Sequence, residues 1–264
     1  MAETAAQPAP EATEEATGAS RSMTRETLLM LVLPPVLIAA AASGYVWWVQ
    51  TAALDSVEAN QLRWSEVLTL TREHIALTFV SAVIVVLVAI PLGIVLTRGR
   101  MRVAAPAVVG FANAGQAAPS VGLIVLLFLW LGGGFWTAVI ALSVYGILPV
   151  LRNTIVGIQG VEPTLVEAGR GIGMSSTAAL LRIELPLAVP VIMSGVRTSL
   201  VLLAGTASLA CFINAGGLGE ILQTGITLFR FSLMVVGALL IALLALLIEW
   251  LGRLLEFVAR PKGI

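Results

Sequence analysis

The feature that most restricts the fold of this chain is a series of long apolar runs separated by short charged segments. Hydrophobic residues make up 58% of the sequence and charged residues 11%. A helix needs about 20 apolar residues to cross the hydrocarbon core of a bilayer. Six such runs occur, at about residues 28–49, 75–97, 107–131, 135–151, 187–213 and 231–251. The sequence therefore predicts an all-α membrane protein of about six transmembrane helices.

The basic residues between these runs predict the orientation, because cytoplasmic loops carry an excess of Lys and Arg. With the N-terminus inside, the cytoplasmic segments contain Arg21, Arg25, Arg98, Arg100, Arg102, Arg152, Arg170, Arg182, Arg253, Arg260 and Lys262. The outer segments contain Arg63, Arg72 and Arg230. Both termini are then predicted to be cytoplasmic, as is the largest internal loop, at about residues 152–186.

Composition argues against several classes of protein. The net charge is zero and no basic stripe occurs, so we expect no nucleic-acid partner. The single cysteine, Cys211, forms no intrachain disulfide, and the single histidine, His74, rules out a metal site built on two histidines. We expect His74 at the membrane surface. Residues 1–22 are rich in Ala, Glu, Pro, Thr and Ser, which predicts a disordered cytoplasmic tail rather than a cleavable signal peptide.

The predicted cytoplasmic loop has the pattern of a helix, a glycine turn and a second helix. Glu162-Pro163 is typical of a helix start, and glycines at 169, 171 and 173 should end that helix near Gly173. One of the hydroxyl residues at 175–177 can cap a second helix, which Pro186 stops or bends. On spacing alone, an ordinary helical hairpin between two membrane spans fits equally well.

The residues of this loop also match a known motif. Glu167-Ala168-Gly169, three residues, Gly173, nine residues and Ile183-Glu184-Leu185-Pro186 resemble the EAA loop of permeases from bacterial ABC importers. Gly169 stands where a second alanine is more usual. The resemblance implies the MetI-like fold of these permeases and a cytoplasmic coupling helix that lies in a groove of a separate ATPase subunit. It implies an ATPase-coupling role for Glu167, Ala168, Gly169, Gly173, Met174, Ile183, Leu185 and Pro186.

Three further segments extend the resemblance over about residues 75–230. Gln116–Ser120, Tyr145–Thr154 and Ala215–Gly219 are similar to segments of permeases for osmoprotectants such as glycine betaine, choline, carnitine and proline betaine. The resemblance implies import of such a solute across the bacterial plasma (inner) membrane. It also implies as partners two ATPase subunits, a second permease copy or a paralogue, a separate extracytoplasmic solute-binding protein and the surrounding membrane lipid. Ergothioneine, methionine or another amino acid is an alternative solute.

The predicted spans and the resemblance together divide the chain into four parts. They are a tail at 1–22, a first transmembrane helix and external loop at 23–74, a permease core at 75–230 that contains the EAA loop at 160–186, and a last transmembrane helix with the cytoplasmic C-terminus at 231–264. The glycines at 169, 171 and 173 lack the following lysine and the preceding strand of a nucleotide loop, and no nucleophile elbow occurs. We therefore expect no hydrolytic activity and no cofactor in this chain, with ATP and Mg bound by the partner ATPase.

Polar residues inside the apolar runs are candidates for a solute pathway. Arg197 is the one basic residue well inside a run, and four small residues, Ser194, Thr198, Gly205 and Ser208, share a narrow helix face beside it. That face predicts either a pathway or subunit interface, or close helix packing with Arg197 extending towards the cytoplasm. Asn113, Gln116, Ser120 and Tyr145 are further candidates for the pathway or for a helix interface. A self-contained channel or secondary transporter should show mid-membrane ionisable groups or paired broken helices, and beyond Arg197 the sequence indicates neither.

Overall fold

The computed structural model describes the backbone of residues 12–259 and the side chains of residues 31–256, and in this part of the chain all regular elements are helical. The elements are α1 (Ala12–Thr51), α2 (Ser56–Gln61), α3 (Trp64–Leu96), η1 (Gly99–Ala104), α4 (Ala105–Ala117), α5 (Ser120–Leu131), α6 (Phe135–Gln159), α7 (Pro163–Gly171), α8 (Ser176–Ala179), the π-turn η2 (Leu180–Glu184), α9 (Leu185–Thr206), η3 (Ala207–Ile213), α10 (Gly219–Thr227) and α11 (Phe231–Ala259).

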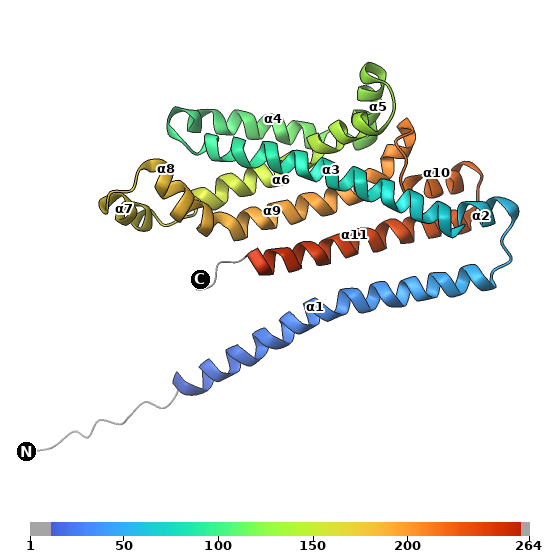
Figure 1. The fold of residues 1–264 in the computed structure, drawn as a ribbon, viewed down its shortest axis with the longest axis horizontal. Coiled ribbons are helices and arrows are strands. Elements are labelled where there is room, and N and C mark those ends of the chain that lie inside the picture. The colour runs from blue at the N-terminus through green and yellow to red at the C-terminus, as the bar shows by residue number, and fades with distance from the viewer. Residues whose placement is uncertain (1–11, 260–264) are drawn as a thin grey trace, which may run out of the picture.

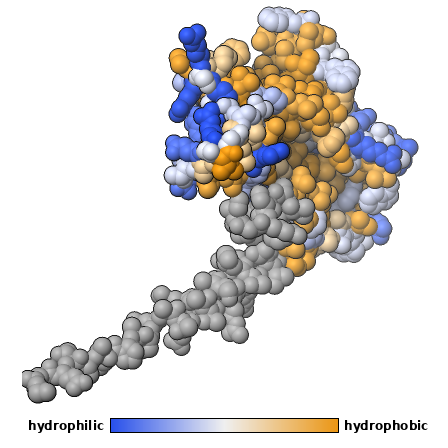
Figure 2. Space-filling view, turned by 60° about the vertical axis from the view of Figure 1, so that its left-hand side comes forward, coloured by the Kyte–Doolittle hydropathy of each residue, from blue (hydrophilic) through white to orange (hydrophobic). Residues whose placement is uncertain are grey.

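Long helices lie roughly along one axis, with α3, α6, α9 and α11 side by side and α1 along the outer side of α11 (Figure 1). One end of the molecule carries η1, α7 and α8, and is called the α7 end. The opposite end carries α2 and α10, and is called the α10 end. A broad hydrophobic surface separates hydrophilic regions at the two ends (Figure 2), as a membrane-spanning protein requires.

The prediction of about six spans is confirmed, with changes in their limits. Five helical segments are long and apolar enough to cross a membrane: Leu31–Thr51, Trp64–Leu96, Phe135–Gln159, Ser176–Ile213 and Phe231–Glu256. The second begins eleven residues earlier than the predicted 75, so that Arg72 and the predicted boundary at 74/75 lie inside α3. The N-terminal eleven residues of the predicted tail lie outside the described residues, and α1 begins at Ala12 in a segment rich in the helix formers Ala and Glu.

The third predicted span, residues 107–131, is wrong as a single helix. It consists of α4, preceded by η1, and α5, and the two halves are bent by 95° at the break between them. Ala118 adopts an extended backbone (φ −63°, ψ 143°) before Pro119, as sterics favour for a residue before proline. Pro119 supplies no N–H to continue the ladder of α4. The pair counts as a sixth span only if a bent pair crosses the membrane as one.

The loop predicted at 152–186 is shorter in the structure. The fourth span continues to Gln159, eight residues past the predicted 151, because helix α6 carries the polar segment Arg152–Thr154 on its own turns. The second helix of the loop does not stop at Pro186: α8 runs through the π-turn η2 into α9, and Ser176–Ile213 forms one span. The π-turn shifts the hydrogen-bond register directly before Pro186, where the missing N–H would otherwise interrupt the helix.

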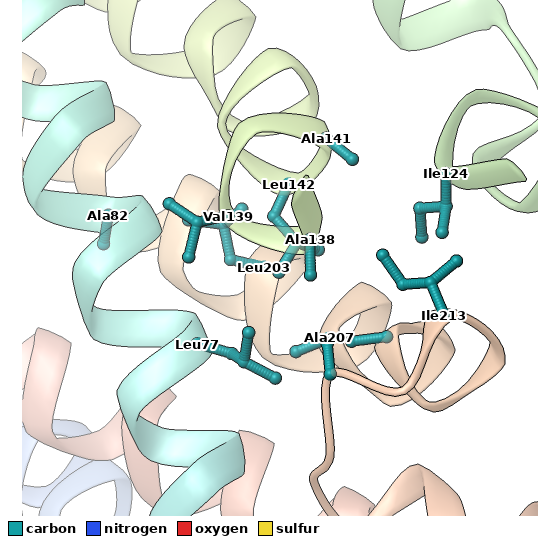
Figure 3. Close-up of a cluster of buried hydrophobic side chains, with 12 residues drawn as sticks. Leu77, Ala82, Ile124, Ala138, Val139, Ala141, Leu142, Leu203, Ala207 and Ile213 are labelled. Carbon is teal, nitrogen blue, oxygen red and sulfur yellow. The ribbon is translucent and has the colours of Figure 1, made fainter. Parts of the chain in front are cut away.

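Small residues bring the central helices together. The largest core cluster joins α3, α5, α6, α9 and η3 through side chains such as Leu77, Ile124, Leu142 and Leu203 (Figure 3). A Cβ atom at Gly195 of α9 would lie 2.8 Å from the carbonyl oxygen of Pro149 in α6. Close approach through glycine and alanine is how helices pack in lipid, where burying apolar surface gives little drive for association.

At the α10 end, the segment between α1 and α3 is tied to the start of α11. Asp55 caps α2 by accepting hydrogen bonds from the backbone N–H groups of Val57 and Glu58, at 2.9 Å each, and its other oxygen lies 2.6 Å from Arg230. The Ser232 hydroxyl donates to Glu58. Because α1 contacts mainly α11, these bonds fix the outermost span to the rest of the bundle.

Candidate functional site

The first candidate site is α7, the helix that the sequence assigns to coupling, which projects at one end of the molecule (Figure 1). Pro163 lies in its first turn, as predicted. Its last turn is closed by two hydrogen bonds, from Gly173 N to Arg170 O at 3.0 Å and from Met174 N to Gly169 O at 3.1 Å. This pair of bonds is the Schellman arrangement, and Gly173 holds the left-handed position with φ +93°. The predicted glycine turn therefore lies at Gly173.

The next helix is capped as the sequence indicated. Ser175 accepts a hydrogen bond from the backbone N–H of Ala178, at 3.2 Å, and Arg170 of α7 donates to the Ser176 hydroxyl at 2.6 Å. The side chains of Glu167 and Ala168 are exposed, whereas Gly169 is buried. The exposed face of α7 is thus available to another protein, and the opposite face packs inward.

Gly169 forms the contact between α7 and the return helix. A Cβ atom there would overlap Ile183 Cδ1 and would lie 3.3 Å from Met174 Sδ. The structure thus brings together Gly169, Met174 and Ile183 of the predicted coupling set, and the absence of a side chain at Gly169 leaves room for the tip of Ile183. Leu185 and Pro186, the last two residues of the predicted coupling set, are the first two residues of α9.

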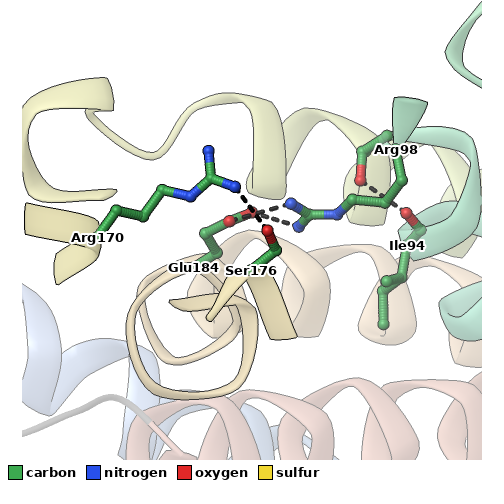
Figure 4. A network of polar contacts seen from close by, with 6 residues as sticks. Ile94, Arg98, Arg170, Ser176 and Glu184 are labelled. Carbon is green, nitrogen blue, oxygen red and sulfur yellow. Dashed lines mark hydrogen bonds and ion pairs between the residues drawn. The ribbon is translucent and has the colours of Figure 1, made fainter. Parts of the chain in front are cut away.

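Glu184 links this loop to another membrane helix (Figure 4). Both of its carboxylate oxygens accept from the guanidinium group of Arg98, which follows the C-terminus of α3; the Nη1–Oε1 distance is 3.0 Å. The Glu184 side chain is 8% exposed and that of Arg98 is 38% exposed. The sequence did not predict this pair, although an acid between the apolar residues Ile183 and Leu185 was a signal.

Arg197 does not join the small-residue face beside which the sequence put it. Its guanidinium Nη1 lies 3.3 Å from a Glu256 oxygen and 4.0 Å from a Glu249 oxygen, both on α11, and Arg253 also binds Glu249 at 2.8 Å. Gly252 makes room for the stem of Arg197, whose Cγ would lie 3.2 Å from a Cβ there. Sequence reasoning missed these carboxylates, although Glu249 lies inside the last predicted apolar run.

The small-residue face contains Ser194, Thr198 and Gly205 of α9 and Ser208 of η3. Thr198 and Gly205 are exposed, and the other two are half-buried. Thr198 donates to Ser194 O at 2.9 Å and Ser208 donates to Gly205 O at 2.7 Å, so the hydroxyl groups are satisfied within their own chain segment. No side chain described here fills the space beside Gly205. Ser208 packs closely on Gly219 of α10, whereas Thr198 and Gly205 stay exposed in this chain.

The helix break between α4 and α5 gathers the remaining candidates. Gln116 Nε2 donates to the backbone oxygen of Tyr145 at 3.2 Å, and the Tyr145 hydroxyl donates to the backbone oxygen of Ala118 at the break. Ser120 starts α5, and Asn113 is exposed on α4. Non-helical backbone at membrane depth is tolerated only where protein buries it or where it lines a water-filled cavity. The Tyr145 hydroxyl satisfies one backbone oxygen of the break, so this break brings Gln116, Tyr145 and Ser120 of the predicted set together.

A further polar cluster lies towards the α10 end. Glu73 of α3 accepts from the backbone N–H of Gly217 at 3.0 Å. Burial, followed by repulsion from Glu73 and Glu66, raises the pKa of Glu220 on α10. The expectation that His74 lies at the membrane surface is wrong: its side chain is fully buried, with Nε2 2.8 Å from Ala204 O. Among the described residues, no three His, Cys, Asp or Glu side chains are grouped to hold a metal ion.

Comparison with known proteins decides the family. The family described as "binding-protein-dependent transport system inner membrane component" matches residues 89–260, which is more than half of the chain. The chain belongs to this family. It is therefore a multi-pass permease component of ABC transport in the inner membrane, and the predicted resemblance to ABC importer permeases is confirmed.

Individual members of this family support the osmoprotectant branch. A Bacillus subtilis protein named as the glycine betaine/carnitine/choline transport system permease OpuCB is 40% identical over 77% of this chain and 93% of its own length. The Bacillus subtilis choline transport system permease OpuBB is also 40% identical, over 79% of this chain and 95% of its own. The Salmonella typhimurium osmoprotectant import permease OsmW is 38% identical, over 74% and 93%.

The fold agrees with solved ABC transporters. A chain of the MetNI methionine ABC transporter in an inward-facing form has a TM-score of 0.64 and 22% sequence identity, covering 74% of this chain and 96% of its own. An amino acid ABC transporter has a TM-score of 0.63 and 18% identity, covering 78% and 100%. The all-helical ABC permease fold predicted from the sequence is thus confirmed.

Proposed function

We propose that this chain is the permease subunit of an ATP-driven importer for a compatible solute of the glycine betaine, choline, carnitine or proline betaine type. The observation that carries the proposal is α7: an exposed short helix closed by Gly173 and packed through Gly169 on a helix that continues into the membrane. The solute class rests on the printed names of the relatives that are 38–40% identical. Ergothioneine, methionine or another amino acid is the alternative cargo.

The α7 end is proposed to face the cytoplasm, with both termini on that side. The basic residues between the spans support this orientation. Two ATPase subunits would then bind α7 from each of two permease subunits, and they would bind the ATP and Mg that this chain is not expected to hold. A separate solute-binding protein would deliver the cargo at the α10 end, and this chain itself would catalyse no hydrolysis.

Movement of α7 has a physical route to the membrane helices. Gly169 contacts Ile183, and the neighbouring Glu184 forms an ion pair with Arg98 just after the end of α3. A displacement of α7 would therefore act on α9 through the continuous helix and on α3 through the ion pair. The ion pair makes Glu184 a positioning residue. The broken helix at Pro119, with Gln116 and Tyr145 beside it, is the proposed place where the solute crosses, because a helix break exposes backbone groups to a polar ligand.

Replacing Gly173 tests the coupling role of the loop. Gly173→Ala forces a side chain into the left-handed region, at a cost of about 1–2 kcal/mol, and should open the turn that orients α7. We expect the variant to insert normally but to co-purify with much less ATPase subunit. Gly171→Ala is the matched control, since Gly171 lies in the same helix, with open space beside it and no positive φ. Normal ATPase recovery and transport by Gly173→Ala combined with Glu167→Ala would contradict the coupling role.

A further inference from the structure

A cavity of about 390 Å³ lies between the start of α4 and the end of α6, at the α7 end of the molecule. Two arginines line it, Arg102 in η1 and Arg152 in α6, together with Gln159. The remaining wall is apolar and includes Val109, Ile155 and Val156. The lining therefore combines two positively charged residues with apolar side chains.

The two arginines of the cavity differ from the paired arginines of the described chain. Arg98, Arg197, Arg230 and Arg253 each pair with a carboxylate. Neither arginine of the cavity forms an ion pair with any described residue, and no Asp or Glu is among the lining residues. Two cations that share one concave site without a carboxylate favour an anionic ligand from outside the chain.

The apolar wall favours one kind of anion. Val156 is 58% exposed, and Val103, which adjoins Arg102 in η1, is 85% exposed. Apolar side chains are therefore exposed in the wall of the cavity at Val156 and beside the cavity at Val103. A free phosphate ion gains nothing from such a wall, whereas the acyl chain of a lipid does.

We propose that this cavity binds an anionic phospholipid, with the headgroup phosphate between Arg102 and Arg152 and an acyl chain along Val109, Ile155 and Val156. Arginine pairs well with phosphate because its fork of N–H donors matches the phosphate oxygens. Basic pockets between transmembrane helices on the cytoplasmic side are known as headgroup sites. Only the assignment to the inner leaflet rests on the proposed orientation, and the binding itself does not.

The test measures the affinity of the purified full-length chain in detergent micelles for phosphatidylglycerol and for phosphatidylcholine of the same acyl chains. The variant is Arg102→Gln with Arg152→Gln. Its matched control is Arg100→Gln with Arg182→Gln, which removes the same charge from exposed arginines at the same end that do not line the cavity. Each arginine near an anionic headgroup contributes roughly fivefold to affinity, so we expect the cavity variant to lose about 25-fold in affinity for phosphatidylglycerol and the control variant less than about threefold.

Several results would overturn the proposal. These are equal affinity of the wild type for the two lipids, equal losses in the cavity and control variants, or displacement of the lipid by millimolar inorganic phosphate. Loss of ATPase co-purification in the cavity variant, with lipid affinity unchanged, would instead assign the two arginines to a protein partner. The lipid-affinity measurement itself uses no ATPase and no solute. Lipid binding can therefore be absent while the proposed transport function holds, and lipid binding can be present while that function is wrong.

Discussion

The ion pair between Arg98 and Glu184 should stabilise the fold, and the exposed fractions of the two side chains set how much free energy of unfolding each single variant loses. Arg98→Met leaves a carboxylate that is 8% exposed without its partner. Breaking a buried pair in this way costs about 3–5 kcal/mol. Glu184→Gln instead leaves a guanidinium group that is 38% exposed and still reaches water, so its cost should be nearer 1–2 kcal/mol.

The two single variants should therefore be unequal, and the double variant should be less damaged than Arg98→Met alone. In the double variant the Glu184 carboxylate is replaced by a neutral amide, and burying an unpaired amide costs about 1–3 kcal/mol. The assay is thermal unfolding of the purified chain in detergent, where Arg98→Met should lower the Tm by on the order of 10 °C. Arg253→Met is the control: it removes an exposed pair (42% and 24% exposed) and should cost less than about 1 kcal/mol.

The result that would refute this reasoning is additivity. If the double variant loses as much as the two single variants together, the groups do not interact in the folded protein. Equal losses in the two single variants would also contradict the argument, because it derives the asymmetry from the difference in exposure.

Three further predictions concern other parts of the bundle, each read from thermal unfolding of the purified chain. Gly219→Ala should destabilise by about 3 kcal/mol or more, since its Cβ would overlap the backbone oxygen of Ser208, whereas Gly110→Ala, in open space on α4, should be neutral or stabilising. Burial and repulsion raise the pKa of Glu220 above its ordinary value of 4.5, so ionisation destabilises the fold as pH rises from 4.5 through the raised pKa. The Tm of Glu220→Gln should therefore be higher than that of the wild type at pH 7 and equal to it at pH 4. The same Tm difference at both pH values would refute this. Arg197→Met should cost about 1–3 kcal/mol, because the two partly exposed carboxylates that it contacts on α11 lose a partner. An unchanged Tm would count against that contact.

Local sequence signals predicted the parts of the structure that depend on local chemistry. The start of α7 at Pro163, the turn at Gly173 and a helix cap within residues 175–177, which the structure places at Ser175, follow from preferences of single residues. The apolar runs predicted the spans because hydrocarbon thickness fixes their length. The end of α6 was placed too early because hydropathy treats polar residues on a helix as a loop, although α6 holds Arg152 in a regular turn.

The rest depends on contacts between distant segments. Arg98 and Glu184 are 86 residues apart, and the sequence around either residue does not indicate which residue it pairs with. The carboxylates that hold Arg197 lie on another helix, so the same residue supported two opposite interpretations in the sequence. Pro119 was a local signal for the break in the third span, but the apolar composition on both sides of it outweighed that signal. The 95° bend was therefore missed.

Direct transport is the measurement that tests the central claim. The chain is reconstituted in liposomes with its ATPase subunit, with a solute-binding protein at the α10 end and ATP at the α7 end. Uptake of labelled glycine betaine is followed with and without hydrolysable ATP. The account predicts uptake that requires ATP, the ATPase and the binding protein together, and that is lost in Gly173→Ala but retained in Gly171→Ala. Uptake by the chain alone, down a solute or ion gradient and without ATP, would contradict it.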